Sequence, residues 1–70
     1  MQLNAYFSLF KCLHFVNRND PMDEVSIIAS ADESEVTVHQ YLYGKEKTVR
    51  AGYYADIVAE LTRSGYVAVV

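Results

Sequence analysis

The clearest alternation of apolar and polar positions lies in the last third of the chain. Apolar side chains recur there at steps of three and four residues, which places them on one face of a helix: Tyr54, Ile57, Val58 and Leu61. Asp56 near the start and Arg63 near the end suit the helix dipole. Gly65 provides a residue that accepts a left-handed conformation after the last turn. The pattern predicts a helix over residues 52–64.

Residues 66–70 follow this helix directly and are all apolar. The segment is β-branched and too short for a helix, so it predicts a strand. An edge strand of a one-sided sheet usually alternates apolar and polar residues. The unbroken apolar run therefore predicts a central strand that is covered on both faces.

Residues 2–17 are largely apolar, with polar side chains at intervals of three and four. These polar positions trace one narrow stripe on a helix: Asn4, Ser8, Lys11, His14 and Arg18. The aromatic content would also suit a strand, but the stripe favours a helix over residues 2–17. The apolar face of this helix is wider than one small sheet requires.

The middle of the chain, residues 24–50, predicts antiparallel strands joined by short polar turns. Residues 25–30 form the first predicted strand, and a polar loop leads into a second strand over residues 35–43. A turn at Gly44 precedes residues 48–50, which form either a short third strand or merely the approach to the helix.

Alternation along the second predicted strand separates two faces. Val36, Val38 and Leu42 point one way, whereas the other face carries Thr37, His39, Tyr41 and Tyr43.

The order of elements predicts one domain over residues 1–70 of the α+β class. It is a small two-layer domain with an N-terminal helix, a mostly antiparallel three-strand sheet, a second helix and a C-terminal central strand. The predicted core consists of Val36, Val38, Leu42, Ile57, Val58, Leu61, Val67 and Val69, with Val25 and either Ile27 or Ile28.

A chain of seventy residues has a small core, and its single cysteine offers little to stabilise it. The hydrophobic share of 51% is high for so small a chain, which favours oligomerisation. A chain this short buries only about 60% of its unfolded surface. One cysteine excludes an internal disulfide, and Cys12, His14 and His39 are too scattered to form a zinc site within one chain. Association with a second subunit is therefore the remaining way to stabilise this small core.

We therefore expect a two-fold homodimer through the spare face of the first helix. Its interface would contain Phe7, Phe10 and Phe15. In an alternative monomer, the first helix would cover the far face of the sheet and hide the tyrosines there.

The net charge of −3 argues against a general nucleic-acid binder, which needs a basic surface. Acidic residues concentrate between Asp20 and Glu35, and Lys45, Lys47 and Arg50 lie close together after them. The two groups are either solvated loops or a docking surface with two oppositely charged ends.

The sequence shows no catalytic motif. The glycines are isolated, no paired-cysteine or His-x-x-x-His spacing occurs, and Asp32 and Glu33 lie in a polar loop. Cys12 and His14 resemble a nucleophile and its base, but two residues apart on a helix they would face about 200° from each other. We expect no enzyme, no cofactor and no metal ion.

The candidate binding surface is the strand face with His39, Tyr41 and Tyr43, continuing into Lys45 and Lys47. Aromatic side chains on a strand suit a protein interface or plain packing between neighbouring strands, and beside cations they also suit stacking of unpaired bases. The chain lacks the aromatic-and-glycine signature of the common RNA-recognition fold.

We therefore expect a self-associating protein-interaction module that binds or masks a macromolecular partner, and single-strand nucleic-acid binding is the alternative. A short chain without catalytic residues is typical of accessory proteins from phages and other mobile elements.

The single cysteine and the lack of a cleavable leader predict a cytoplasmic protein. The first sixteen residues are apolar, but Lys11 and His14 interrupt them. The run is also shorter than the roughly 20 residues that a membrane span needs. We expect no membrane association.

Overall fold

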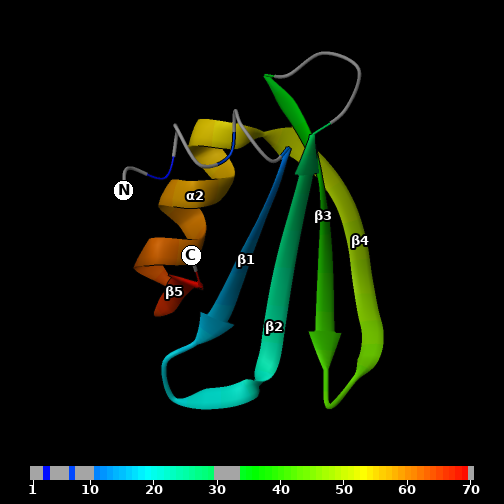
Figure 1. Cartoon of the computed structure of the whole chain (residues 1–70), viewed down its shortest axis with the longest axis vertical. Coiled ribbons are helices and arrows are strands. Elements are labelled where there is room, and N and C mark those ends of the chain that lie inside the picture. The colour runs from blue at the N-terminus through cyan, green and yellow to red at the C-terminus, as the bar shows by residue number, and fades with distance from the viewer. Residues whose placement is uncertain (1–2, 4–6, 8–10, 30–33, 70) are drawn as a thin grey trace.

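The computed structural model describes residues 3, 7, 11–29 and 34–69, and the described part is built mainly from strands. Five antiparallel strands form one sheet in the order β4-β3-β2-β1-β5. The elements are β1 (Cys12–Asn17), β2 (Asp20–Ala29), β3 (Glu35–Leu42), β4 (Lys45–Tyr53), α2 (Tyr54–Arg63) and β5 (Tyr66–Val69). Figure 1 shows α2 lying over one side of the sheet, beside β1 and β5.

The expected architecture with an N-terminal helix over residues 2–17 is wrong. Residues 12–17 form β1, which pairs with β2 on one side and with β5 on the other. Burial along β1 alternates, because Leu13 and Phe15 are buried and His14 is exposed. Two ladders of backbone hydrogen bonds and this alternate burial favour the strand. Of the earlier residues, Leu3 and Phe7 are helical, Lys11 lies in a bend, and the others lie outside the described residues.

The C-terminal strand exists, but the prediction that it is central is wrong. Among the strands that the structure describes, β5 pairs only with β1 and therefore forms an edge of the sheet. Tyr66 and Ala68 pack against the core, whereas Val67 and Val69 are 44% and 52% exposed. An all-apolar strand carries no polar residue to mark its outward side, so its sequence does not distinguish a central from an edge position.

The predicted helix near the C-terminus is confirmed as α2. Ile57 and Leu61 are its buried residues, and Asp56 and Arg63 lie in its first and last turns. Gly65 follows with φ of +90°, a left-handed conformation that glycine adopts without steric cost. The helix thereby ends where the chain must reverse into β5.

The core lies between α2 and the inner face of the sheet. The buried side chains are Phe7, Leu13, Phe15, Val25, Ile27, Val36, Val38, Ile57 and Leu61. Of the other expected core residues, Val58 packs against this cluster and Leu42 is half-buried. Ile28, Val67 and Val69 are exposed.

The phenylalanines expected in a dimer interface are therefore partly accounted for within one chain. Phe15 is 1% and Phe7 5% exposed, and the ring of Phe7 stacks on Tyr54 at a centroid distance of 4.4 Å. Phe10 lies outside the described residues. The premise that Phe7 and Phe15 would remain in water without a second subunit does not hold.

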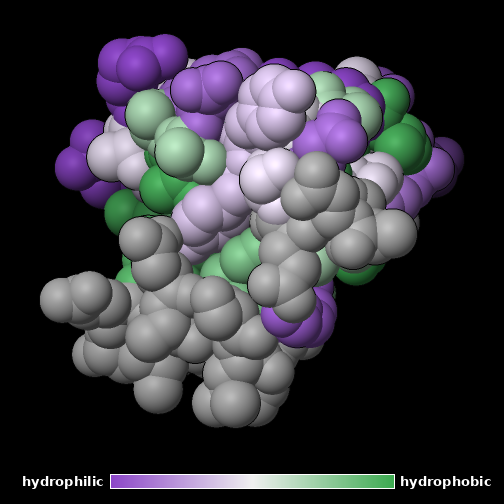
Figure 2. All heavy atoms as spheres, turned by 90° about the horizontal axis from the view of Figure 1, so that it is seen from above, coloured by the Kyte–Doolittle hydropathy of each residue, from purple (hydrophilic) through white to green (hydrophobic). Residues whose placement is uncertain are grey.

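The side of the sheet opposite to α2 is covered by no element in the described part of the chain. We call it the open face. The strand registers place on it Cys12, His14, Val16, Glu24, Ser26, Ile28, Glu35, Thr37, His39, Tyr41, Glu46, Val49, Ala51, Tyr53, Val67 and Val69. Seen from above, the described surface shows hydrophobic side chains only as small areas among hydrophilic ones (Figure 2).

Candidate functional site

Two of the three predicted aromatic residues lie together on the open face. The rings of His39 and Tyr41 on β3 stack with a centroid distance of 6.5 Å and an interplanar angle of 15°. Tyr43 lies in the turn between β3 and β4 with φ of +54° and is 64% exposed. Its hydroxyl donates a hydrogen bond to Asp20 Oδ2 at 3.3 Å. Tyr43 therefore belongs to a turn contact and not to the aromatic strand face.

Of the two predicted lysines, Lys45 does not extend this aromatic face. Lys45 pairs with Leu42 in the register and so lies on the inner side of the sheet. Lys47 falls at the irregularity between the pairs formed by Gln40 and Tyr41.

The charged group beside the two aromatic rings is instead a carboxylate. Glu46 pairs with Tyr41, and its Oε1 lies 3.1 Å from His39 Nδ1. A carboxylate accepts hydrogen bonds, so this contact puts a proton on Nδ1. The negative charge of Glu46 beside the stacked rings of His39 and Tyr41 opposes phosphate binding.

Cys12 and His14 meet on the open face, and the prediction that they cannot meet is wrong. On a strand, residues two apart point to the same side. Cys12 Sγ lies 3.6 Å from His14 Nε2, and His14 Nδ1 lies 2.9 Å from Ser26 Oγ on β2. The Cys-x-His spacing carried this signal, but it becomes informative only when the segment is known to be a strand.

A depression of about 400 Å³ lies next to this cluster on the open face. Its lining includes His14, Glu24, Ser26, Tyr41 and Val69. The depression joins the cysteine–histidine pair on β1 to the aromatic pair on β3. The centre of the open face is therefore concave and combines polar, aromatic and aliphatic side chains, which suits a docking surface.

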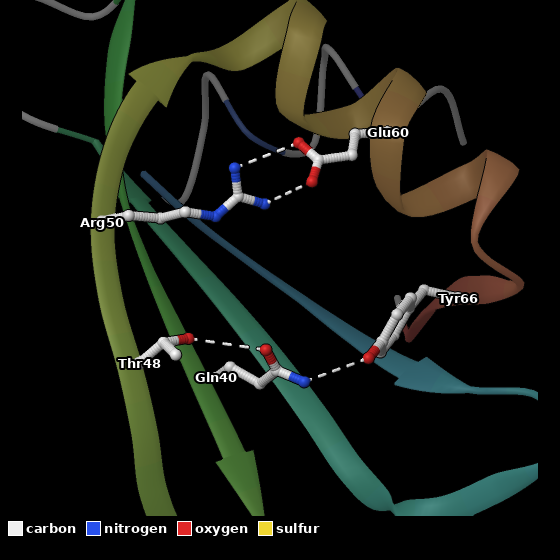
Figure 3. A network of polar contacts seen from close by, with 5 residues as sticks. All are labelled: Gln40, Thr48, Arg50, Glu60 and Tyr66. Atoms are coloured by element: carbon white, nitrogen blue, oxygen red, sulfur yellow. Dashed lines mark hydrogen bonds and ion pairs between the residues drawn. The ribbon is translucent and has the colours of Figure 1, made fainter.

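A second candidate is a polar pocket of about 320 Å³ on the inner side of the sheet, next to α2. The residues that line it are Asn17, Val25, Val38, Gln40, Thr48, Arg50, Glu60, Leu61, Ser64 and Tyr66. In Figure 3, Gln40 lies between Thr48 and Tyr66, and Arg50 reaches from β4 toward Glu60 on α2.

Three polar side chains of this pocket, those of Asn17, Gln40 and Tyr66, are bonded to Asp23, which sequence reasoning missed. Asp23 is 9% exposed and accepts hydrogen bonds from Tyr66 Oη at 2.6 Å, Gln40 Nε2 at 3.0 Å and Asn17 Nδ2 at 3.1 Å. Burial by itself would raise the pKa of Asp23, but these three hydrogen bonds favour the carboxylate and hold the pKa below its ordinary value of 3.8. Asp23 is thus kept as a charged acceptor.

Arg50 and Glu60 close one side of the pocket as a two-pronged ion pair. Arg50 Nη1 and Nη2 donate to the two carboxylate oxygens of Glu60 at 3.0 and 2.9 Å. Both side chains are nearly half exposed, so the pair contributes at most about 1 kcal/mol to stability. The pair connects β4 to α2. Arg50, which was grouped with Lys45 and Lys47 as one end of a possible docking surface, is therefore already bonded within the chain.

The polar pocket is better explained by structure than by ligand binding. Gln40 accepts from Thr48 Oγ1 at 3.4 Å while donating to Asp23 and Tyr66. Among the described residues, Tyr54 Oη is the one buried side-chain polar atom without a hydrogen-bond partner. The groups that face the pocket therefore satisfy one another, and a ligand would have to break these bonds.

The hydrogen bonds of Tyr66 make its pKa and its contribution to stability measurable in alkaline solution. Burial, the hydrogen bond to Asp23 and the negative charges of Asp23 and Asp20 raise the pKa of Tyr66 to about 12. Because the folded pKa exceeds the unfolded value of 10.0, the contribution to stability is complete below pH 10 and is lost as the pH rises toward 12.

We expect the difference in tyrosinate absorbance between the parent and Tyr66→Phe to titrate near pH 12. A difference curve centred near pH 10 would show that the hydrogen bond from Tyr66 to Asp23 is absent in solution.

The described residues offer no group of three or more His, Cys, Asp or Glu side chains that could hold a metal ion within one chain. None of their helices is long and apolar enough to cross a membrane. No protein-family model, no curated protein and no solved structure matches this chain.

Proposed function

We propose that this chain is a non-enzymatic, self-associating protein-binding module that docks on a macromolecular partner through its open face. The observation that carries the proposal is that a five-stranded sheet leaves one whole side uncovered by the described residues. Antiparallel sheets with one solvated side usually carry polar residues there. This side instead exposes Ile28, Val49, Val67 and Val69 by 42 to 52%.

The composition of the open face favours a protein partner over a nucleic acid. The residues that the registers place on it combine aliphatic groups, the aromatic rings of His39, Tyr41 and Tyr53, small hydroxyls and three carboxylates, and none of these paired residues is a lysine or an arginine. A phosphate backbone requires cations, whereas a protein interface is built around aromatic and aliphatic anchors with few charges. Single-strand nucleic-acid binding remains the second candidate because His39 and Tyr41 stack.

The partner surface is assigned to the half of the open face formed by β3 and β4. Tyr41 is its central anchor, flanked by His39 and by Glu46 opposite it. A half-buried tyrosine offers a large contact area at low conformational cost and is a frequent source of interface energy. We also propose a reducing, cytoplasmic location, which a free thiol at Cys12 would suit.

We expect Tyr41→Ala to weaken partner binding at least tenfold, which corresponds to about 1.4 kcal/mol. Tyr43→Ala removes the same side chain from the neighbouring turn and serves as the matched control with parent-like affinity. The partner would be captured from the native cells with the parent chain and identified by mass, and both variants would then be compared by calorimetric titration.

A random single-stranded oligonucleotide tests the second candidate in the same assay. Oligonucleotide binding that weakens steeply with added salt would replace the protein-binding proposal. Partner binding by Tyr41→Ala at the parent affinity would remove Tyr41 from the docking surface.

A further inference from the structure

Cys12 and His14 have the spacing of two ligands of one tetrahedral metal ion. Zinc binds cysteine sulfur at about 2.3 Å and histidine nitrogen at about 2.0–2.1 Å, so a tetrahedral angle separates the two ligand atoms by roughly 3.5 Å. Cys12 Sγ and His14 Nε2 lie 3.6 Å apart. The separation of the sulfur and the nitrogen therefore matches that of two ligands of one tetrahedral ion.

Ser26 supplies the partner that a metal-binding histidine needs. Its Oγ lies 2.9 Å from His14 Nδ1, on the ring nitrogen away from Cys12. Histidines that bind metals usually donate their other N–H to a neighbouring acceptor, which fixes the tautomer and the ring orientation. A proton on Nδ1 leaves Nε2, the ring nitrogen near the thiol of Cys12, with a lone pair that can bind a metal ion.

The ligand count shows that one chain provides half of a site. No group of three ligand-type side chains forms among the described residues, whereas structural zinc takes four protein ligands. Two chains related by a two-fold axis would supply two sulfurs and two nitrogens. This is the Cys₂His₂ set of structural zinc sites.

The residues around the pair suit a second copy of this chain. In the register, Ile28 stands opposite Cys12, and Val69 stands opposite His14. They are 42% and 52% exposed, and Val67 beside them is 44% exposed. Their burial would be favourable and would shield the metal from water. Sheets packed face to face lie about 10 Å apart, so a metal midway would be about 5 Å above each sheet, near the reach of both side chains.

We propose that Cys12 and His14 bind Zn²⁺ together with the same two residues of a second copy, which joins two open faces through their β1 and β5 halves. The inference deepens the self-association in the proposed function and leaves the β3 and β4 half for the partner. It moves the expected dimer interface away from the buried phenylalanines. It also supplies the stabilising link that a chain with one cysteine lacks.

The test uses the whole metal-free chain, titrated with zinc chloride in a phosphine reductant that prevents a disulfide between two copies. We expect one zinc ion to bind per two chains by calorimetry and a monomer to become a dimer in sedimentation equilibrium. Cobalt as a spectroscopic probe should show a thiolate charge-transfer band and the absorption of a tetrahedral ion.

Variants assign the ligands. Cys12→Ser and His14→Gln should each abolish zinc-dependent dimerisation, and Ser26→Ala should weaken zinc binding by about 10–100-fold. His39→Gln removes the other histidine of the chain and should keep both the stoichiometry and the dimer. Circular dichroism identifies any variant that fails to fold.

Three results would each overturn the site: one zinc ion per chain without a dimer, no zinc binding by the folded chain, or zinc-dependent dimerisation of Cys12→Ser. A dimer that forms equally well without metal would overturn the zinc site and leave self-association in place. Loss of partner binding by Tyr41→Ala with an intact zinc dimer would separate the two halves of the open face.

Discussion

Phe15→Ala is expected to leave the chain largely unfolded at room temperature. Phe15 is 1% exposed and lies on β1, which is bonded to a strand on each side. Truncating a buried phenylalanine to alanine costs about 3–5 kcal/mol, because the transfer free energy is lost and a cavity remains. A chain of 70 residues has a total stability of roughly 4–10 kcal/mol at the usual value per residue. The substitution therefore removes most of the stability.

Val16→Ala provides the matched control for this experiment. Val16 is the next residue on β1, lies on the open face and is only half-buried. We expect it to cost about 1 kcal/mol. Urea denaturation followed by circular dichroism gives both free energies of unfolding. A Phe15→Ala variant as stable as Val16→Ala would show that Phe15 does not face the core.

The helix near the C-terminus was predictable because its signals are local. Ile57 and Leu61 repeat at the helical step, and Gly65 marks the reversal after it. Each of these features acts within a few residues. The sequence therefore contains the evidence for α2 whether or not its tertiary neighbours are known.

Strand β1 was not predictable in the same way, because its stability depends on distant partners. His14 pairs with Val69 on one side and with Ser26 on the other, and neither partner is a near neighbour in the sequence. The alternation from Cys12 to Val16 spans only five residues. The helical spacing of polar residues covers the longer segment 2–17. From the sequence alone, this spacing is stronger evidence than the strand alternation over five residues.

The error over β1 carried directly into the candidate site. On a helix, Cys12 and His14 point apart, and on β1 they point to one side with their ligand atoms 3.6 Å apart. The predicted strand over residues 35–43, observed as β3, by contrast correctly brought His39 and Tyr41 together. Tyr43 does not belong to this group because it follows the end of β3 and itself adopts a left-handed conformation.

Asp23 was missed because a carboxylate in an acidic stretch of sequence looks like a surface residue. Met22 beside it is exposed, and Asp23 itself is turned inward by the alternation of β2. Its three hydrogen-bond donors come from β1, β3 and β5. A local sequence pattern cannot predict a buried polar group whose hydrogen-bond partners lie on three other strands.

Asp23→Ala is expected to cost about 3 kcal/mol, the second largest effect that we predict. Hydrogen bonds to a charged group contribute roughly 1.5–3 kcal/mol, and removing the shared acceptor leaves buried donors unpaired. The donors affected are the hydroxyl of Tyr66 and the side-chain amides of Gln40 and Asn17. Urea denaturation at neutral pH measures the loss.

The dependence of stability on pH distinguishes the charge of Asp23 from its shape. The folded pKa lies below the ordinary value of 3.8, so the carboxylate stabilises the fold at neutral pH, and this contribution is lost as the pH falls through the folded pKa. Asp23→Asn keeps the shape but neither titrates nor offers Tyr66 the same acceptor.

The parent should therefore lose stability relative to Asp23→Asn as the pH falls below about 5, and the two should converge in acid. Tyr66→Phe supplies the third corner of a double-mutant cycle, since it removes the shortest of the three hydrogen bonds and keeps the ring. An acid profile of Asp23→Asn parallel to that of the parent would mean that Asp23 is not held as a bonded carboxylate. Strands β1, β2, β3 and β5 would then be held together by their apolar packing and backbone ladders without this polar centre.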